Sequence, residues 1–227
     1  MAKFKIDFKI DWKSKLIDLL IVIIGITIAF KLNNWNDSFK TELEAKGYIE
    51  SFYEENKTNY ESLVSAIDFA NSNKRDIDTL KNMLLSGTYS DTRIKSLSAS
   101  MMTLADFNPS TTTMENITAS GEFDMITDID LRKDIISTYK SYKTSTKLEG
   151  LIADYVNEYV TPFFFENVRF RDFESINADF SKDPHFENIV LGYEVLLNQQ
   201  ISGYKSNLEK QKVLDDRLTT ANNRFKQ

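Results

Sequence analysis

Two hydrophobic patterns divide the chain, one continuous and one periodic. A continuous apolar run extends from Leu16 to Leu32 and holds eight β-branched residues between Ile17 and Ile28. From Asp37 onward, apolar residues recur instead at intervals of three and four or their sums, which is the spacing of one helix face. The first pattern predicts a helix surrounded by lipid, and the second predicts amphipathic helices packed around a core.

The continuous run has the length and the flanks of a membrane anchor. At a rise of about 1.5 Å per residue it reaches roughly 25 Å, close to the roughly 30 Å of a hydrocarbon core. Trp12 and Trp35 bracket the run as interfacial residues do, and Lys31 can extend its ammonium to water from the last turn. A buried core helix would not need Lys and Trp at its ends, and no small-x-small cleavage site follows the run. We therefore predict an uncleaved transmembrane helix at residues 16–36.

Three residues inside this run are candidates for contacts with a partner. Asp18 is costly in lipid, so it is protonated, lies at headgroup depth beside lysines, or pairs with a partner helix. Gly25 and Ala29 have the small-xxx-small spacing that lets helices approach closely. Together with Trp12, Lys31 and Trp35, they form the predicted set of membrane and partner contacts.

Positive charge before the run predicts its orientation. Residues 1–33 carry six lysines against three aspartates, and the lysines before the run are Lys3, Lys5, Lys9, Lys13 and Lys15. Positively charged flanks stay in the cytoplasm, so residues 37–227 are expected in the periplasm of a bacterium with two membranes. Residues 1–15 are a basic cytoplasmic segment, either an interfacial element or a disordered tail.

The part beyond the anchor reads as an all-α helical bundle. Gly (7) and Pro (3) are scarce, and long amphipathic stretches dominate. A first helix ends at Ser86-Gly87, with polar Asn56 and Lys74 interrupting its apolar stripe. The further predicted helices cover Asp91–Phe107, Thr113–Ser120, a long stretch from Asp128 or Asp130 to about Phe165, and Glu187–Phe225. Pro162 kinks or ends the long one, and residues 166–187 are irregular.

A motif in the anchor resembles a known family. An acidic residue, six residues, Gly-Ile-x-Ile-Ala, three residues and Asn-Asn-Trp-Asn resemble the start of an uncharacterised family of bacterial membrane proteins that is abundant in the Bacteroidota. The motif stands here as Asp18, Gly25-Ile26, Ile28-Ala29 and Asn33-Asn34-Trp35-Asn36. This chain departs from it by lacking a Gly before the acidic residue and by having Lys31 where Gln is usual.

A second stretch extends the resemblance to residues 15–145. Met114–Ile126, followed by Leu131 and Tyr139, is similar to a Ser-Gly-containing region of the same family. The family has no assigned activity, so the resemblance implies topology and an α-helical outer domain but no reaction.

Composition narrows the possible chemistry. The chain has no Cys, which excludes disulfides, thiolate metal sites and a cysteine nucleophile. The net charge is −6, and the part beyond residue 33 carries −9, which makes nucleic acid an unlikely partner. His185 is the single histidine, and Asp124, Asp128 and Asp130 lack the Gly and terminal Glu of a calcium loop. We expect no metal, no cofactor and no enzymatic activity.

An aromatic and basic cluster precedes the last helix. Aromatic residues and Arg are enriched at binding hot spots, so the cluster is a possible partner surface, although a plug over the end of the bundle is the preferred interpretation. Its residues are Phe163, Phe164, Phe165, Arg169, Phe170, Arg171 and Phe173.

These features predict a membrane-anchored, non-enzymatic interaction protein, a scaffold or accessory subunit of a bacterial inner-membrane assembly. The expected partners are the lipid bilayer and either further copies of the chain or another membrane protein. A periplasmic sensor or ligand-binding domain that acts through a membrane partner is the alternative. A hydrolase is a third hypothesis, which requires His185 within hydrogen-bond reach of a nucleophile.

Overall fold

A computed structural model describes residues 12–225, apart from the side chains of residues 13 and 14. The chain divides into two compact units at Gly47–Tyr48. Helix α1 (Trp12–Leu85) contributes to both, and residues 48–85 are called here the bundle segment of α1. Residues 37–47 of the predicted outer domain therefore belong to the first unit. Most of the predicted basic segment, including Lys3, Lys5 and Lys9, lies outside the described residues.

Helices dominate the described part of the chain, so the predicted all-α class is confirmed. After α1 the longer helices are α3 (Thr112–Ser120), α4 (Ile129–Tyr155) and α6 (Pro184–Arg224). The shorter elements are α2 (Arg93–Ala99), α5 (Thr161–Asn167), the 3-10 turns Ser100–Met102, Phe123–Met125 and Phe180–Lys182, the π turn Val156–Val160, and strands β1 (Val168–Arg169) and β2 (Glu174–Ser175).

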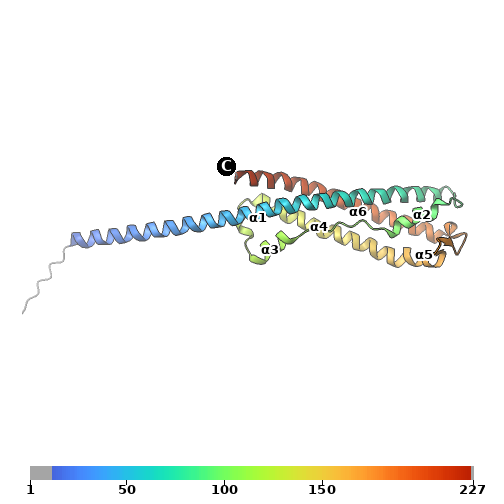
Figure 1. Cartoon of the computed structure of the whole chain (residues 1–227), viewed down its shortest axis with the longest axis horizontal. Helices are drawn as coiled ribbons and strands as arrows, with labels where there is room; N and C mark the ends of the chain where they lie inside the picture. The colour runs from blue at the N-terminus through green and yellow to red at the C-terminus, as the bar shows by residue number, and fades with distance from the viewer. Residues whose placement is uncertain (1–11, 226–227) are drawn as a thin grey trace, which may run out of the picture. The chain divides into compact units, whose positions relative to one another are not determined.

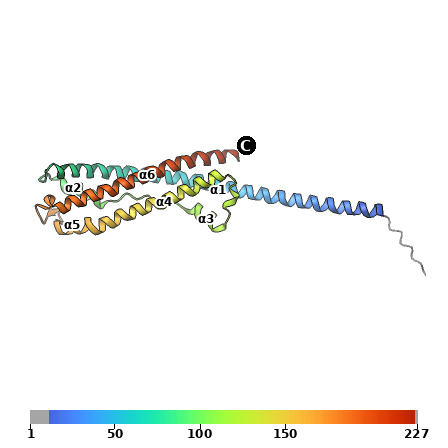
Figure 2. The same cartoon turned by 180° about the vertical axis from the view of Figure 1, so that it is seen from behind.

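The second unit is a bundle of three long helical segments. The bundle segment of α1, α4 and α6 lie side by side, and α6 runs in the direction opposite to α4 (Figures 1 and 2). Gly192 of α6 marks a close approach of these two helices, because a Cβ there would overlap the hydroxyl group of Tyr155, which donates to Ile189 O at 3.1 Å. A side chain at that position would displace the Tyr155 ring.

Core positions alternate in steps of three and four along all three long segments, the heptad spacing of helices that pack along their length. On α4 the half-buried Glu149 occupies one of these positions. The buried residues in this register are 49, 52, 56, 59, 63, 66, 70, 73, 77, 80 and 84 on α1, 131, 135, 138, 142, 145, 152 and 156 on α4, and 186, 190, 193, 197, 200, 204, 207, 211, 214, 218 and 221 on α6. The stripes predicted from sequence are therefore core. Asn56 is a core residue at 2 % exposure, rather than the interruption that its polarity suggests.

A fourth segment of the bundle is extended rather than helical. The sequence predicts a helix through Phe107, but α2 and its 3-10 extension end at Met102, and residues 103–111, called here the strap, have no regular structure. Side chains from three helices supply the hydrogen bonds that the strap backbone would otherwise lack. Asn73 donates to Thr103 O at 2.7 Å, Gln200 donates to Ala105 O at 3.1 Å, and Phe107 N donates to Glu149 at 3.1 Å.

The strap is also packed through its one large aromatic ring. Phe107 is 1 % exposed and meets Tyr142 and Tyr204 edge-on, with ring centroids 5.3 and 6.3 Å apart. Asn59 then fixes the end of the strap in both directions, donating to Ser110 O at 2.9 Å and accepting from Ser110 N at 2.7 Å. These contacts favour an extended backbone where local periodicity predicts a helix.

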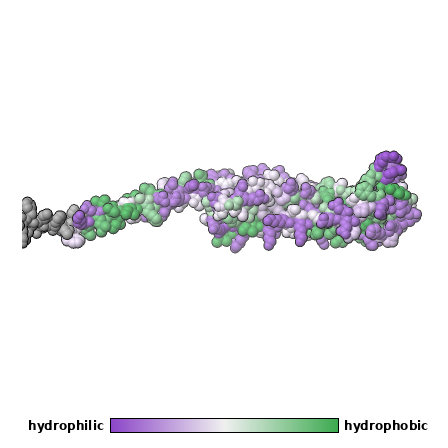
Figure 3. Space-filling model, turned by 90° about the horizontal axis from the view of Figure 1, so that it is seen from below, coloured by the Kyte–Doolittle hydropathy of each residue, from purple (hydrophilic) through white to green (hydrophobic). Residues whose placement is uncertain are grey.

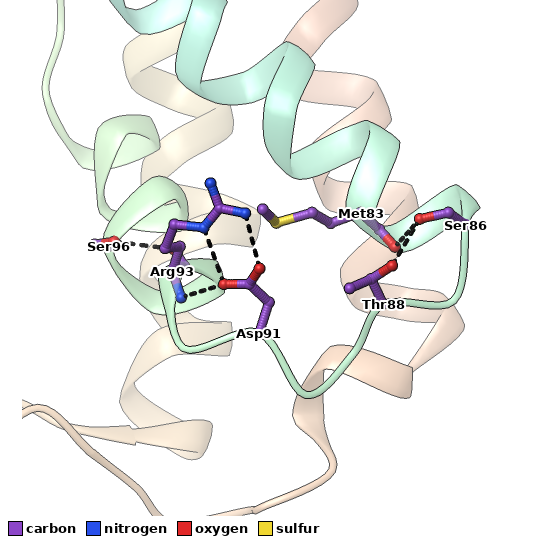
Figure 4. Close-up of polar contacts among 6 residues, drawn as sticks. All are labelled: Met83, Ser86, Thr88, Asp91, Arg93 and Ser96. Carbon is purple, nitrogen blue, oxygen red and sulfur yellow. Dashed lines mark hydrogen bonds and ion pairs between the residues drawn. The ribbon is translucent and has the colours of Figure 1, made fainter.

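Several predicted helix ends are confirmed by their caps. Gly87 and Gly121 adopt left-handed conformations, with φ of 70° and 74°, directly after α1 and α3. The side chain of Asp128 accepts hydrogen bonds from Asp130 N and Leu131 N at the start of α4. Between α1 and α2, Asp91 binds the backbone and the guanidinium of Arg93, while Ser86 contacts Thr88 (Figure 4).

Pro162 changes the helix without ending it. A proline has no N–H, so the regular hydrogen bond to the residue four positions earlier is missing. Here α4 continues into the π turn Val156–Val160, and Pro162 then occupies the first turn of α5, where a free N–H is not required. The predicted long helix therefore ends at Asn167, and the stretch predicted as irregular holds the antiparallel pair of β1 and β2.

Asn59→Ala should loosen the strap. It leaves both Ser110 N and Ser110 O without their partner, and the free energy of unfolding should fall by about 1–3 kcal/mol. Denaturant unfolding of the full chain in mild detergent measures this loss, and hydrogen exchange of residues 103–111 locates it. Asn82→Ala, at an exposed site of the same helix, is the control. Equal effects of the two substitutions would contradict this role of Asn59.

Candidate functional site

The apolar run of α1 is exposed along its whole length. The side chains from Leu16 to Leu32 are open to solvent, the large apolar ones by 49–65 %. None of the 18-residue apolar window is buried by other residues that the structure describes, and it is the one stretch among them that is long and apolar enough to cross a membrane. Figure 3 shows it as a hydrophobic surface near the N-terminal end of the described chain.

The predicted contact residues of the anchor are exposed on this helix. Trp12 and Trp35 are 75 % and 71 % exposed. A Cβ on Gly25 would meet nothing within 4 Å, so the helix surface is open there. Asp18, Gly25, Leu32 and Phe39 follow at intervals of seven residues, and Ala29 lies one turn after Gly25. A face of this spacing is suited to a neighbouring helix.

This apolar face of α1 continues beyond the predicted membrane–water interface at Trp35. Phe39 and Leu43 are 61 % and 60 % exposed and lie four and eight residues after Trp35. At about 1.5 Å per residue, Leu43 is roughly 12 Å farther along the helix than Trp35. Headgroups extend only about 5–8 Å beyond each side of the hydrocarbon core. Phe39 and Leu43 are not among the contacts predicted from the sequence. Their helical spacing from Leu32 and Trp35 is the sequence signal that could have identified them.

The predicted aromatic cluster divides into a buried and an exposed part. Phe163 and Phe164 are 5 % and 1 % exposed, so their assignment to a partner surface is wrong. Phe163 stacks on Phe186 with ring centroids 5.2 Å apart and meets Phe180 at 6.4 Å. The plug interpretation therefore holds for these two residues, because α5 places them over the first turns of α6.

Phe165, Phe170 and Phe173 form the exposed part. They are 64 %, 45 % and 38 % exposed, and the ring centroids of Phe165 and Phe170 lie 5.0 Å apart. Arg169 and Arg171 both bind Asp172 in the turn between β1 and β2, at 2.8 and 3.4 Å. Arg169 is the main cause that lowers the pKa of Asp172. The charge of the two arginines is thus partly balanced within the turn, which leaves the three exposed phenylalanines as the apolar surface.

Two glutamates connect the strap to the helices. Glu55 accepts hydrogen bonds from the Tyr139 hydroxyl and from Thr113 N at 2.9 Å, so it caps the start of α3. Glu149 accepts from Phe107 N and from the Tyr204 hydroxyl at 2.5 Å. Burial raises the pKa of Glu149, against the lowering effect of these two hydrogen bonds. Sequence reasoning missed both residues, since their partners lie 42–84 positions away along the chain.

The residues considered for catalysis or metal binding have structural contacts. His185 is exposed in the first turn of α6, and no hydrogen bond joins its imidazole to another described residue. The nucleophile that the hydrolase hypothesis requires is therefore not beside it. Asp124 binds Arg132, Asp128 caps α4, and Asp130 pairs with Lys133 at 3.4 Å. Each carboxylate has a local partner instead of converging with the other two.

Comparison with known proteins gives one match. A family model with the description "Family of unknown function (DUF6090)" matches residues 18–190, which include Asp18, the predicted anchor and most of the bundle. No curated protein and no solved structure gives a significant match.

Glu149→Gln should reduce the pH dependence of the free energy of unfolding. The folded state holds the proton of Glu149 more tightly than the unfolded state, so the free energy of unfolding falls as pH rises from 4.5 through the raised pKa. The amide oxygen of Gln still accepts both hydrogen bonds but does not ionise. Denaturant unfolding between about pH 4 and pH 7 should show a smaller fall in the variant than in the wild type.

Glu54→Gln, at an exposed position, is the matched control and should keep the wild-type pH profile. A Glu149→Gln profile that coincides with the wild type would show that burial of this carboxyl does not affect folding.

Proposed function

The chain belongs to the DUF6090 family, a family of unknown function, and we propose that it is a membrane-anchored, non-enzymatic interaction protein that serves as a scaffold or accessory subunit of a bacterial inner-membrane assembly. The observation that carries this proposal is the exposed apolar face of α1, which continues from the anchor past Trp35 to Leu43.

Lipid accounts for the first part of that face. Burying a Leu, Ile or Val side chain is worth about 1.5–3 kcal/mol, and ten Leu, Ile and Val side chains between residues 16 and 28 are exposed. Placing them in a bilayer therefore recovers on the order of 15–30 kcal/mol. The backbone is already helical there, so each of its polar groups is satisfied without water.

The charge distribution supports one orientation. The lysines before the anchor favour a cytoplasmic N-terminus, which would leave the acidic bundle in the periplasm. Lys31 and Trp35 would occupy the periplasmic interface, and Trp12 the cytoplasmic one.

A protein partner accounts for the rest of the face. Leu43 lies farther from Trp35 than headgroups reach, Phe39 lies at their outer edge, and both side chains are exposed. Asp18, Gly25 and Leu32 lie on the same face within the anchor, so one helix from a partner or from a second copy would cover the whole of it. The role of the protein is then to hold that partner at the membrane while the bundle extends the contact surface.

Phe39→Ser together with Leu43→Ser should weaken this association. Loss of two buried apolar side chains of about 1.5–3 kcal/mol each lowers affinity by at least a hundredfold. Mild-detergent purification followed by mass measurement and identification of the bound proteins compares the variant with the wild type. Thr41→Ala, on the opposite side of the helix, should leave the complex intact. A complex unchanged in mass and composition by the double substitution would contradict the proposal.

Asp18→Leu tests the anchor's own part in the association. If Asp18 binds a partner helix, its loss reduces co-purification while the protein remains in the membrane fraction. Ile17→Leu is the neighbouring control. Unchanged association would remove Asp18 from the interface and leave the contact to Phe39 and Leu43.

A further inference from the structure

A groove lies between the bundle segment of α1 and the last third of α6. Its volume is about 460 Å³, within the range of small-molecule sites. All of its residues belong to the second unit, so it is independent of the anchor. The residues that line it are Tyr53, Asn56, Lys57, Tyr60, Glu61, Lys212, Asp215 and Asp216.

The floor of the groove contains an unsatisfied hydrogen-bond acceptor. Asn56 is 2 % exposed, and its amide nitrogen donates to Gln211 O at 3.3 Å. Its Oδ1 has no partner among the described residues, and neither has Oε1 of the neighbouring Gln211. A buried polar group without a hydrogen bond costs about 1–3 kcal/mol. The floor therefore favours a ligand that brings a hydrogen-bond donor.

The walls carry both signs of charge. Glu61, Asp215 and Asp216 provide three carboxylates, and Lys57 and Lys212 provide two ammonium groups. Within the described part of the chain, none of these five groups forms an ion pair with another residue. Unpaired charges of both signs around one groove suit a ligand that itself carries both signs.

Two tyrosines complete the groove. Tyr53 and Tyr60 are half-buried on α1, one on each side of Asn56. Their rings offer apolar surface to the body of a ligand, and their faces attract a cation.

A second groove lies between α4 and α6, and none of the described residues that line it has a buried oxygen without a hydrogen-bond partner. It has a volume of about 340 Å³ and is lined mainly by Ser and Thr side chains with Lys140 and Lys210. Its buried amide, Asn207, already donates to Ser145 Oγ at 2.6 Å and to Ser141 O at 3.3 Å. The unpartnered oxygen distinguishes the groove between α1 and α6.

We propose that the groove between α1 and α6 binds a small zwitterion of the α-amino-acid type. The ammonium group of the ligand donates to Asn56 Oδ1 and is balanced by the carboxylates of the walls, while its carboxylate pairs with Lys57 or Lys212. A simple diamine would leave the lysines without a counter-charge, and a simple anion would meet three carboxylates. This site goes beyond the proposed interaction function, because it requires neither the anchor nor a protein partner.

Calorimetric titration of the full chain in mild detergent tests the site. The probes are the common free amino acids, with putrescine as the diamine and acetate as the anion. At least one amino acid should bind and raise the midpoint of thermal unfolding as its concentration increases. Putrescine and acetate should bind at least tenfold more weakly. Absence of binding by every amino acid at millimolar concentration would overturn the proposal, as would equal binding of putrescine or acetate.

Substitutions assign the binding to this groove. Asn56→Leu removes the acceptor and should weaken binding tenfold or more, since a hydrogen bond to a charged group is lost. Asp215→Asn keeps the shape of the wall and should also weaken binding. This variant tests whether the ligand binds in the groove if Asn56→Leu does not fold. Asn222→Leu removes another buried amide with an unpartnered oxygen outside the groove and should leave binding unchanged. Wild-type binding by the folded groove variants would place the ligand elsewhere and contradict the proposal.

Discussion

The surface between Leu16 and Leu32 constrains the whole protein, because the other described residues cover none of it. In water this helix would expose a continuous apolar surface far larger than soluble proteins tolerate. A bilayer removes that cost and requires no other structure than the helix already present. In the proposed account the same argument applies beyond the anchor, where Phe39 and Leu43 remain exposed and Leu43 lies past the expected headgroups. The proposed function follows from these two requirements, one met by lipid and the other by protein.

The bundle is stabilised in a different way. Its long segments pack in heptad spacing, yet several of the core positions are polar, among them Asn59, Asn73 and Gln200. Each of these amides binds the backbone of the strap, so the helices and the strap fix one another's register. Buried amides reduce the stability that apolar residues would give, but they select one arrangement of the chain. Asn56 and Gln211 differ from these amides, since the side-chain oxygen of each has no partner among the described residues.

Much of this architecture could be predicted from the sequence, and the errors have physical causes. Gly87, Gly121 and Asp128 indicate helix ends by local chemistry, and the structure confirms all three. The strap was predicted as a helix because the apolar residues before Phe107 have helical spacing, whereas the amides that hold it come from distant helices. Asn56 was interpreted as an interruption because its partner Gln211 lies 155 residues away. The sequence leaves Phe163 and Phe164 as candidates for a partner surface beside the preferred plug interpretation, because adjacent aromatic residues do not reveal which of them face the core.

The most direct test of this account asks what surrounds the apolar run. Membranes from cells that express the full chain can be washed at alkaline pH, and protease can be added after the outer envelope is opened. The account predicts that the protein stays in the washed membranes and that protease removes the acidic bundle while residues 16–36 remain protected by lipid. Release of the intact chain into the wash, or a bundle that resists protease until the inner membrane is broken, would contradict it.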